Sequence, residues 1–182
     1  MRKRILPKKI CIVGAESTGT TTMAKALAKH YATNWVPEYG REYYEAKIYR
    51  KDANNWQTEE FIEIAKEQNR REELLAKTAN KVLICDTDSF ATSVWHERYM
   101  KFRSPKVEKI SKNRHYDLYL LTDTDIPFVQ DGTRDGQNIR QWMHETFITR
   151  LRENNKKFEI LSGPHEKRFA EAITLIDSII RS

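Results

Sequence analysis

Five short apolar runs rich in β-branched residues recur along the chain, and segments with helical periodicity separate them. Runs that lack strict alternation of apolar and polar residues are typical of strands buried on both faces, as in a parallel sheet. We therefore predict five strands. They are residues 9–13, 35–36, 81–85, 116–121 and 158–161.

The segments between these runs predict helices over 21–31, 58–79 and 139–151, and a last helix from about residue 166. In the second helix, Glu59 and Glu60 stand in the first turn, where negative charge favours a helix. Strand and helix alternate throughout. The pattern predicts an α/β fold with a mainly parallel five-stranded sheet flanked by helices.

The composition excludes several classes of protein. With 182 residues, 39% hydrophobic and 10% aromatic, the chain suits a single folded domain over 1–182 rather than a disordered one. No apolar run approaches the ~18–20 residues of a transmembrane helix, and the apolar stretch after the basic start is too short for a secretory signal. Cys11 and Cys85 lie inside apolar runs, so we expect reduced thiols and a cytoplasmic location.

The net charge of +6 fits a nucleic acid, an anionic membrane surface or an anionic small molecule as partner. One segment, 101–115, holds six Lys or Arg against the single acid Glu108. It is either a solvated surface loop or a segment that faces phosphates.

The sequence Gly-Ala-Glu-Ser-Thr-Gly-Thr-Thr over 14–21 follows the first predicted strand and precedes a helix. This is the spacing of a phosphate-binding loop, in which glycines let backbone N–H groups point inward and the helix N-terminus adds its positive end. Thr21 can offer its hydroxyl to Mg²⁺. Thr20 stands where the motif carries lysine, so another cation has to compensate.

Carboxylates follow two of the predicted strands, at the edge where ligands bind in open α/β sheets. Asp86, at the end of the third strand, is placed to hold Mg²⁺ or to accept a proton from an attacking hydroxyl. Glu38, beside Arg41 after the second strand, could bind a sugar diol or act as the base. For Glu42 we favour a structural role, either a helix cap or a surface ion pair.

A candidate lid spans 123–140 and contains Asp-Gly-Thr-Arg-Asp-Gly over 131–136. Two glycines and a cation between a strand and a helix are typical of a mobile lid. Arg134 and Arg140 are the cations that we expect to offset Thr20 by stabilising the transferring phosphoryl group.

Aromatic residues gather near these strand ends. Trp95 is expected in the core, whereas Tyr99 lies on a polar helix and is a candidate for stacking on a flat heterocycle, with added attraction if the ring is cationic.

Together, the 14–21 loop, Pro-Glu-Tyr-Gly-Arg-Glu over 37–42, Asp-Thr-Asp over 86–88 and the Asp-Gly-Thr-Arg lid resemble the ribosylnicotinamide kinase domain of the NadR family. The similarity runs in the family's order from about residue 9 to 180. It implies an ATP- and Mg²⁺-dependent P-loop kinase that phosphorylates the 5′-hydroxyl of nicotinamide riboside, giving nicotinamide mononucleotide for NAD salvage.

The resemblance also assigns roles by position. Asp86 becomes the base or the metal-linked acid, Glu38 and Arg41 fall in the substrate region, and Tyr99 matches a family tyrosine that stacks on the nicotinamide ring. From the lid and the loop, Arg134 joins Asp86 and Glu38 as a candidate catalytic residue, and Thr21 joins Asp86 as a candidate metal ligand. Pro37 stands where the family has a second stacking tryptophan, which makes Trp35 the candidate replacement. The ATP-binding residues are Gly14, Glu16, Ser17, Thr18, Gly19, Thr20, Thr21, Thr22 and Arg140. The substrate-side residues are Tyr39, Arg41, Asp88, Tyr99 and Asp131.

Three alternatives stay open. The same parts would serve a kinase for another nucleoside or nucleotide. A GTPase needs an Asn-Lys-x-Asp motif, and both Asn-Lys pairs of the chain lack the closing Asp. A nucleic-acid-binding module is suggested by charge alone. We expect no adenylyltransferase activity, because none of the five histidines stands in a His-x-Gly-His pattern.

Overall fold

The computed structural model describes residues 6–132, 134 and 136–181. Residues 1–4, which form the basic start, and Thr133 and Asp135 of the predicted lid lie outside the described residues. The strands are β1 (Lys8–Gly14), β2 (Trp35–Val36), β3 (Val82–Asp86), β4 (Leu118–Thr122) and β5 (Phe158–Leu161). The helices are α1 (Thr20–His30), α2 (Tyr39–Tyr49), α3 (Thr58–Ala76), α4 (Ser89–Met100), α5 (Pro105–Ser111), α6 (Arg140–Glu153) and α7 (His165–Arg181).

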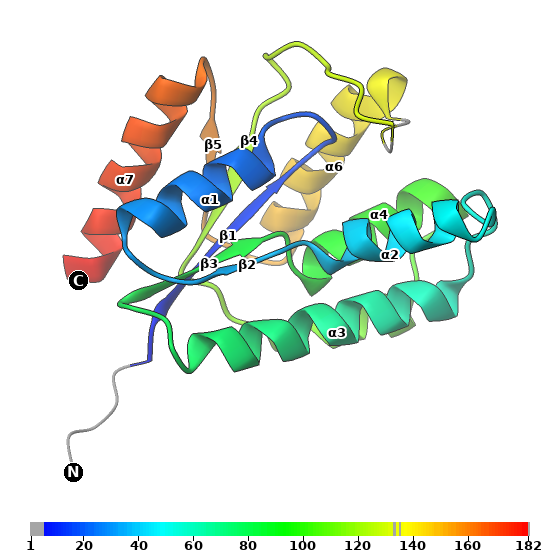
Figure 1. Ribbon diagram of the computed structural model, residues 1–182, viewed down its shortest axis with the longest axis horizontal. Coiled ribbons are helices and arrows are strands. Elements are labelled where there is room, and N and C mark those ends of the chain that lie inside the picture. Colours follow the sequence, from blue (N-terminus) through cyan, green and yellow to red (C-terminus); the bar gives the residue numbers. More distant parts are fainter. Residues whose placement is uncertain (1–5, 133, 135, 182) are drawn as a thin grey trace.

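The five strands form one parallel sheet in the order β2-β3-β1-β4-β5. Cys11 pairs with Cys85 on one side and with Tyr119 on the other. Helices α1 and α7 cover one face of the sheet, and α3, α4 and α6 cover the other (Figure 1). The predicted α/β class and parallel five-stranded sheet are confirmed.

Alternate residues of β1 supply the two cores. Ile10 and Ile12 pack with Met23, Leu27 and other apolar residues of α1 and α7. Cys11 and Val13 point to the opposite face, toward the apolar residues of α4 and α6. Because both faces are buried, β1 is apolar at successive positions, which explains why its sequence lacks strict alternation.

Helices α2 and α5 were not anticipated by the sequence pattern, and α4 was expected only as the polar helix of Tyr99, without bounds. In α2, the inward position Lys47 is fully buried, where its ammonium donates to Glu60 (2.7 Å) and the Asn55 carbonyl (2.7 Å). A lysine at a core position breaks the apolar periodicity that predicts a helix. The seven-residue α5 is too short to show periodicity.

Helix α5 lies inside the basic segment 101–115. Arg103 contacts Glu108 and Glu153, and Arg114 contacts Glu72 and Glu73. No residue of this segment lines the cavity described below. The two arginines are paired with the protein's own carboxylates, which favours the surface-segment alternative over one that faces the phosphates of a ligand in this cavity.

Both cysteines are buried and unpaired, in agreement with the expected thiols. Within the described part of the chain, no helix is both long and apolar enough to span a bilayer.

Candidate active site

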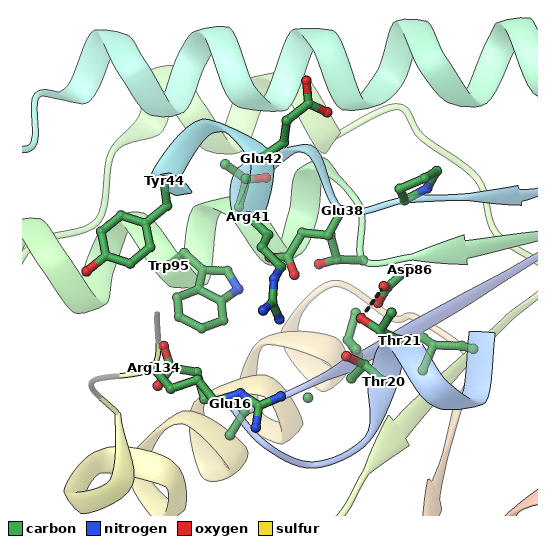
Figure 2. Close-up of a pocket in the computed structure, with 18 of the residues that line it drawn as sticks. Glu16, Thr20, Thr21, Glu38, Arg41, Glu42, Tyr44, Asp86, Trp95 and Arg134 are labelled. Carbon is green, nitrogen blue, oxygen red and sulfur yellow. Dashed lines mark hydrogen bonds between the residues drawn. The ribbon is translucent and has the colours of Figure 1, made fainter. Parts of the chain in front are cut away.

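A cavity of about 680 Å³ opens at the carboxyl ends of the strands. The loop between β1 and α1 lines one end, and residues of α2, α3, α4 and the α2–α3 connection line the other. Figure 2 shows Thr20 and Thr21 at the first end and Tyr44 and Trp95 at the second. Clefts of this size hold small organic ligands, and the carboxyl edge is the usual place for them in open α/β sheets.

Close packing shapes the phosphate loop. A Cβ at Gly14 would lie 2.2 Å from the Thr122 hydroxyl oxygen and 2.6 Å from that of Thr18, so only glycine fits there. Gly19 has a φ of 85°, the left-handed region that favours glycine, and α1 begins at the next residue. The Thr18 hydroxyl donates to the Ala15 carbonyl at 2.7 Å and stiffens the turn.

Thr21 and Asp86 meet in the middle of the cavity, where the Thr21 hydroxyl donates to Asp86 Oδ2 at 2.6 Å (Figure 2). Asp86 is 1% exposed, and its other carboxylate oxygen has no hydrogen-bond partner among the described residues. Burial raises the pKa of Asp86 to about 6, although the bond from Thr21 favours the charged form. A buried carboxylate oxygen with spare acceptor capacity next to a hydroxyl suits a divalent cation.

Glu38 lies beside this pair, immediately before α2. Burial, and next the negative charge of Asp86, raise the pKa of Glu38 to about 8, while Arg41 acts in the opposite direction. Two neighbouring carboxylates with raised pKa values are typical of groups that exchange protons.

An aromatic wall closes the other end of the cavity. Its members are Tyr44, Trp56, Phe61, Trp95 and Tyr99. The rings of Trp95 and Tyr99 are stacked with centroids 6.3 Å apart, and Trp56 lies 5.2 Å from Tyr99. The Trp56 indole N–H is buried without a hydrogen-bond partner among the described residues.

Arg98 connects this wall to the phosphate loop. Its guanidinium lies over the rings of Trp95 and Tyr99 and donates to Glu16 at 2.9 Å. The other Glu16 oxygen accepts the backbone N–H of Gly136 at 2.6 Å. Glu16 therefore ties the phosphate loop to α4 and to the segment that precedes α6.

The segment between β4 and α6 crosses to the phosphate loop and to α2. Arg134 donates to the Ser17 hydroxyl at 3.2 Å and to the Val129 carbonyl. Asp131 Oδ2 lies 2.7 Å from Arg41 Nη2 and 3.2 Å from Arg134 Nε. Most of the residues expected in the site line this cavity. They are Gly14, Glu16, Ser17, Gly19, Thr20, Thr21, Thr22, Glu38, Arg41, Asp86, Tyr99, Asp131 and Arg134.

Two substrate-side predictions are corrected. Asp88 is fully buried, accepting from the Ala91 N–H (2.8 Å) and the Tyr119 hydroxyl (2.6 Å), so it caps α4 instead of facing substrate. Tyr39 faces α3, where the Arg71 guanidinium covers its ring at 4.4 Å. Neither lines the cavity.

Two predictions for the nucleotide end are also corrected. The Thr18 side chain is buried inside the loop and does not line the cavity. Arg140 donates to the Ser17 and Ile126 carbonyls, so it supports the phosphate loop and does not line the cavity. Of the two structural roles expected for Glu42, the surface ion pair is the one observed, with Arg71 at 2.7 Å.

Sequence reasoning placed Trp95 in the core and did not identify Tyr44, Trp56, Phe61 or Arg98. The signal for part of this wall was available, because Trp95, Arg98 and Tyr99 are spaced i, i+3 and i+4 and share one face of a helix. Tyr44 of α2, Trp56 of the following connection and Phe61 of α3 gave no such signal.

Metal-binding side chains do not cluster in the described ranges, where no group of three or more His, Cys, Asp or Glu residues could hold an ion. Any cation in this cavity would be held by fewer than three such side chains, and a bound substrate or nucleotide and water would complete its coordination.

A loop that requires glycine lies between β1 and α1 and faces an acid at the end of the neighbouring strand β3. This arrangement defines a P-loop nucleotide-binding protein. The chain belongs to the AAA domain family (AAA_28), whose model matches residues 9–168.

Among curated proteins, the chain is 27% identical over 181 residues to the trifunctional NAD biosynthesis/regulator protein NadR of Salmonella typhimurium, covering 98% of this chain and 44% of that protein. It is 28% identical over 177 residues to its Escherichia coli K12 counterpart, covering 96% and 43%. The chain thus spans less than half the length of these relatives. The resemblance to the NadR family is confirmed.

Solved structures show the same fold. A NadR protein in complex with NR superposes with a TM-score of 0.83 at 22% identity, over 97% of this chain and 52% of that one. Thymidylate kinase from Ehrlichia chaffeensis superposes with a TM-score of 0.70 at 13% identity, over 94% and 100%. The fold is that of the P-loop kinases.

Proposed function

We propose that this chain is a nicotinamide riboside kinase, which transfers the γ-phosphoryl group of ATP to the 5′-hydroxyl of the riboside. The products are nicotinamide mononucleotide and ADP. One observation carries the proposal: a single cavity holds a phosphate loop at one end, two carboxylates of raised pKa in the middle and an aromatic wall at the other end. The similarity to NadR over nearly the whole chain supports it.

The phosphate loop and the N-terminus of α1 would bind the triphosphate through backbone N–H groups. No acidic residue stands in the first turn of α1, so the helix itself places no negative charge at its N-terminus. Thr21 and Asp86 are the residues that would hold Mg²⁺, since Asp86 Oδ1 is buried without a partner among the described residues. When bound there, Mg²⁺ would neutralise negative charge on the phosphates.

With Asp86 engaged by Thr21, Glu38 is the better candidate for the base. Its carboxylate would accept the proton of the 5′-hydroxyl as that oxygen attacks the γ-phosphorus. The bond between the γ-phosphorus and the oxygen that links it to the β-phosphate would then break, which releases ADP. A pKa raised toward the working pH makes a carboxylate a stronger proton acceptor.

The aromatic wall would bind the nicotinamide ring. Flat heterocycles stack on Trp and Tyr faces, and a cationic ring gains further attraction from them. We propose Trp95 and Tyr99 as the stacking residues. Trp35 is a weaker candidate, because the Lys25 ammonium lies 5.2 Å over its ring.

Two predictions from the sequence extend this proposal. We infer that residues 123–140 act as a lid of a single kinase domain, and the contacts of Arg134 and Gly136 with the phosphate loop support that role. A cytoplasmic location is supported by two buried, unpaired cysteines.

The test is a panel of acceptors with ATP and Mg²⁺, followed by ADP release. It contains nicotinamide riboside, the common ribonucleosides and deoxynucleosides, and thymidine monophosphate. We expect nicotinamide riboside to have the highest kcat/KM. A higher value for another nucleoside or for the monophosphate would instead identify a different P-loop kinase.

A further inference from the structure

Thr20 stands where a phosphate loop usually places the lysine that contacts the terminal phosphates. The loop's own N–H groups supply dipoles but no full charge. Arg41 and Arg134 both line the cavity, and they enter it from opposite sides, one from α2 and the other from the segment before α6 (Figure 2).

The two guanidinium groups converge on one oxygen atom. Asp131 Oδ2 lies 2.7 Å from Arg41 Nη2 and 3.2 Å from Arg134 Nε. A second nitrogen of Arg134 lies 3.2 Å from the hydroxyl oxygen of Ser17, inside the phosphate loop. An anionic oxygen held between two guanidinium groups at the edge of this loop is the environment that a phosphoryl oxygen requires.

The other cations near the loop are directed elsewhere. Lys25 lies over the Trp35 ring, Arg98 is paired with Glu16, and Arg140 and Arg168 donate to backbone carbonyls. Among the described residues that line the cavity, Arg41 and Arg134 are thus the pair whose charged groups already share an anion.

We propose that Arg41 and Arg134 form an arginine clamp for the terminal phosphates of a nucleoside triphosphate, in place of the lysine that Thr20 replaces. Asp131 is the internal anion that holds the clamp together until the nucleotide displaces its carboxylate. This inference rests on the proposed function only in requiring a triphosphate ligand, and it is independent of the acceptor.

The displacement has a direct consequence. A nucleotide that enters the clamp must break the contacts of Asp131 with both arginines, so the Asp131 carboxylate competes with phosphate. Removing the Asp131 charge should tighten phosphate binding, whereas removing either arginine should weaken it.

Titration calorimetry with AMP-PNP and with inorganic tripolyphosphate tests the clamp. We expect Arg41→Ala and Arg134→Ala each to raise Kd about 10- to 100-fold, the loss of a charge-assisted hydrogen bond. Asp131→Asn should lower Kd. Arg70→Ala removes an equal charge from an exposed position on α3 and should leave Kd unchanged. Thermal melting checks that each variant folds, and Arg→Gln substitutions replace any alanine variant that does not.

A rescue experiment separates the clamp from a general charge effect. Adding Thr20→Lys to Arg134→Ala should restore triphosphate binding, because it returns a cation to the same phosphates. Unchanged Kd values in both arginine variants, or weaker binding by Asp131→Asn, would overturn the clamp.

Failure of the clamp and failure of the proposed function give different results. Absence of triphosphate binding by the wild type would overturn both. The predicted Kd changes without any phosphorylation of nicotinamide riboside would leave the clamp standing and refute the acceptor.

Discussion

The two ends of the cavity are built in different ways. Eight consecutive residues form the phosphate loop, and its shape is fixed by close packing at Gly14 and by the backbone of Gly19. The aromatic wall is assembled from side chains of α2, α3, α4 and the connection between α2 and α3, and α4 is far from the others in the sequence. The first end offers backbone dipoles to any polyphosphate. The shape of the second end depends on the side chains that form it, and so this end is the part that can select an acceptor.

We therefore expect variants in different parts of the cavity to change different quantities. Variants of the central carboxylates should lower kcat, variants of the aromatic wall should raise the acceptor KM, and variants of residues that only support the cavity should change stability.

The largest effect is expected for Asp86→Asn. Loss of the carboxylate beside Thr21 should lower kcat by about 10²–10⁴-fold, because charge stabilisation or proton transfer at the reacting centre is lost. Folding should persist, because asparagine keeps the acceptor for Thr21. Steady-state ADP release measures the rate, and Glu171→Gln, on the exposed side of α7, is the control. A rate within tenfold of wild type would remove Asp86 from the centre.

Trp95→Ala should raise the KM for nicotinamide riboside about 5- to 150-fold and leave the KM for ATP unchanged, since ring stacking is worth about 1–3 kcal/mol. Trp95→Phe should recover most of the loss. Trp142→Ala, an exposed tryptophan on α6, is the matched control. Equal changes in both KM values would show that the two ends of the cavity do not bind their ligands independently.

The pH dependence should follow Glu38 and Asp86. A base acts only when it is deprotonated, so kcat/KM should rise as pH increases through the pKa values of about 6 and about 8. Glu38→Gln should remove the upper part of this rise. A flat profile from pH 6 to 8.5 would contradict the role of Glu38.

The same shifts predict a trend in stability. Both carboxyl groups bind protons more tightly in the folded than in the unfolded chain, so the folded state holds more protons above the unfolded pKa of about 4. Their contribution to the free energy of unfolding therefore decreases as pH rises from about 4 to about 8. Glu38→Gln should reduce this decrease in thermal melts of the ligand-free protein, and an identical pH trend in both proteins would contradict it.

The smallest kinetic effect is expected for Trp35→Ala. Trp35 packs against the core on the α1 and α7 side, so its loss should cost stability, up to about 3 kcal/mol, because the ring is only partly buried. The KM for nicotinamide riboside should stay within about threefold of wild type, a change under ~0.7 kcal/mol. Urea unfolding and initial rates measure the two effects. A KM increase as large as that of Trp95→Ala would make Trp35 a second stacking residue.

Much of the fold and of the phosphate end could be predicted because their signals are local. β1, the loop and α1 are contiguous, and Asp86 follows a strand that is apolar at every position before it. The prediction failed for Asp88, where Thr87 adopts a φ of 67° and the chain turns to place Asp88 under α4 as its cap.

Tyr39 and the aromatic wall show a second kind of limit. Glu38, Arg41 and Glu45 face the cavity, whereas Tyr39 contacts Arg71 on α3. The helical turn of α2 separates them in this way. The sequence did not predict α2, because the buried Lys47 interrupts its apolar periodicity. Trp56 comes from an irregular connection, so no sequence period could have placed it beside Tyr99.

Transfer of labelled phosphate from γ-³³P-ATP to nicotinamide riboside tests the central claim most directly. We predict that the wild type moves the label into nicotinamide mononucleotide with one ADP formed per product, and that Asp86→Asn does so at a small fraction of that rate. Release of the label as inorganic phosphate, or its retention in ATP, with no labelled mononucleotide would contradict the account.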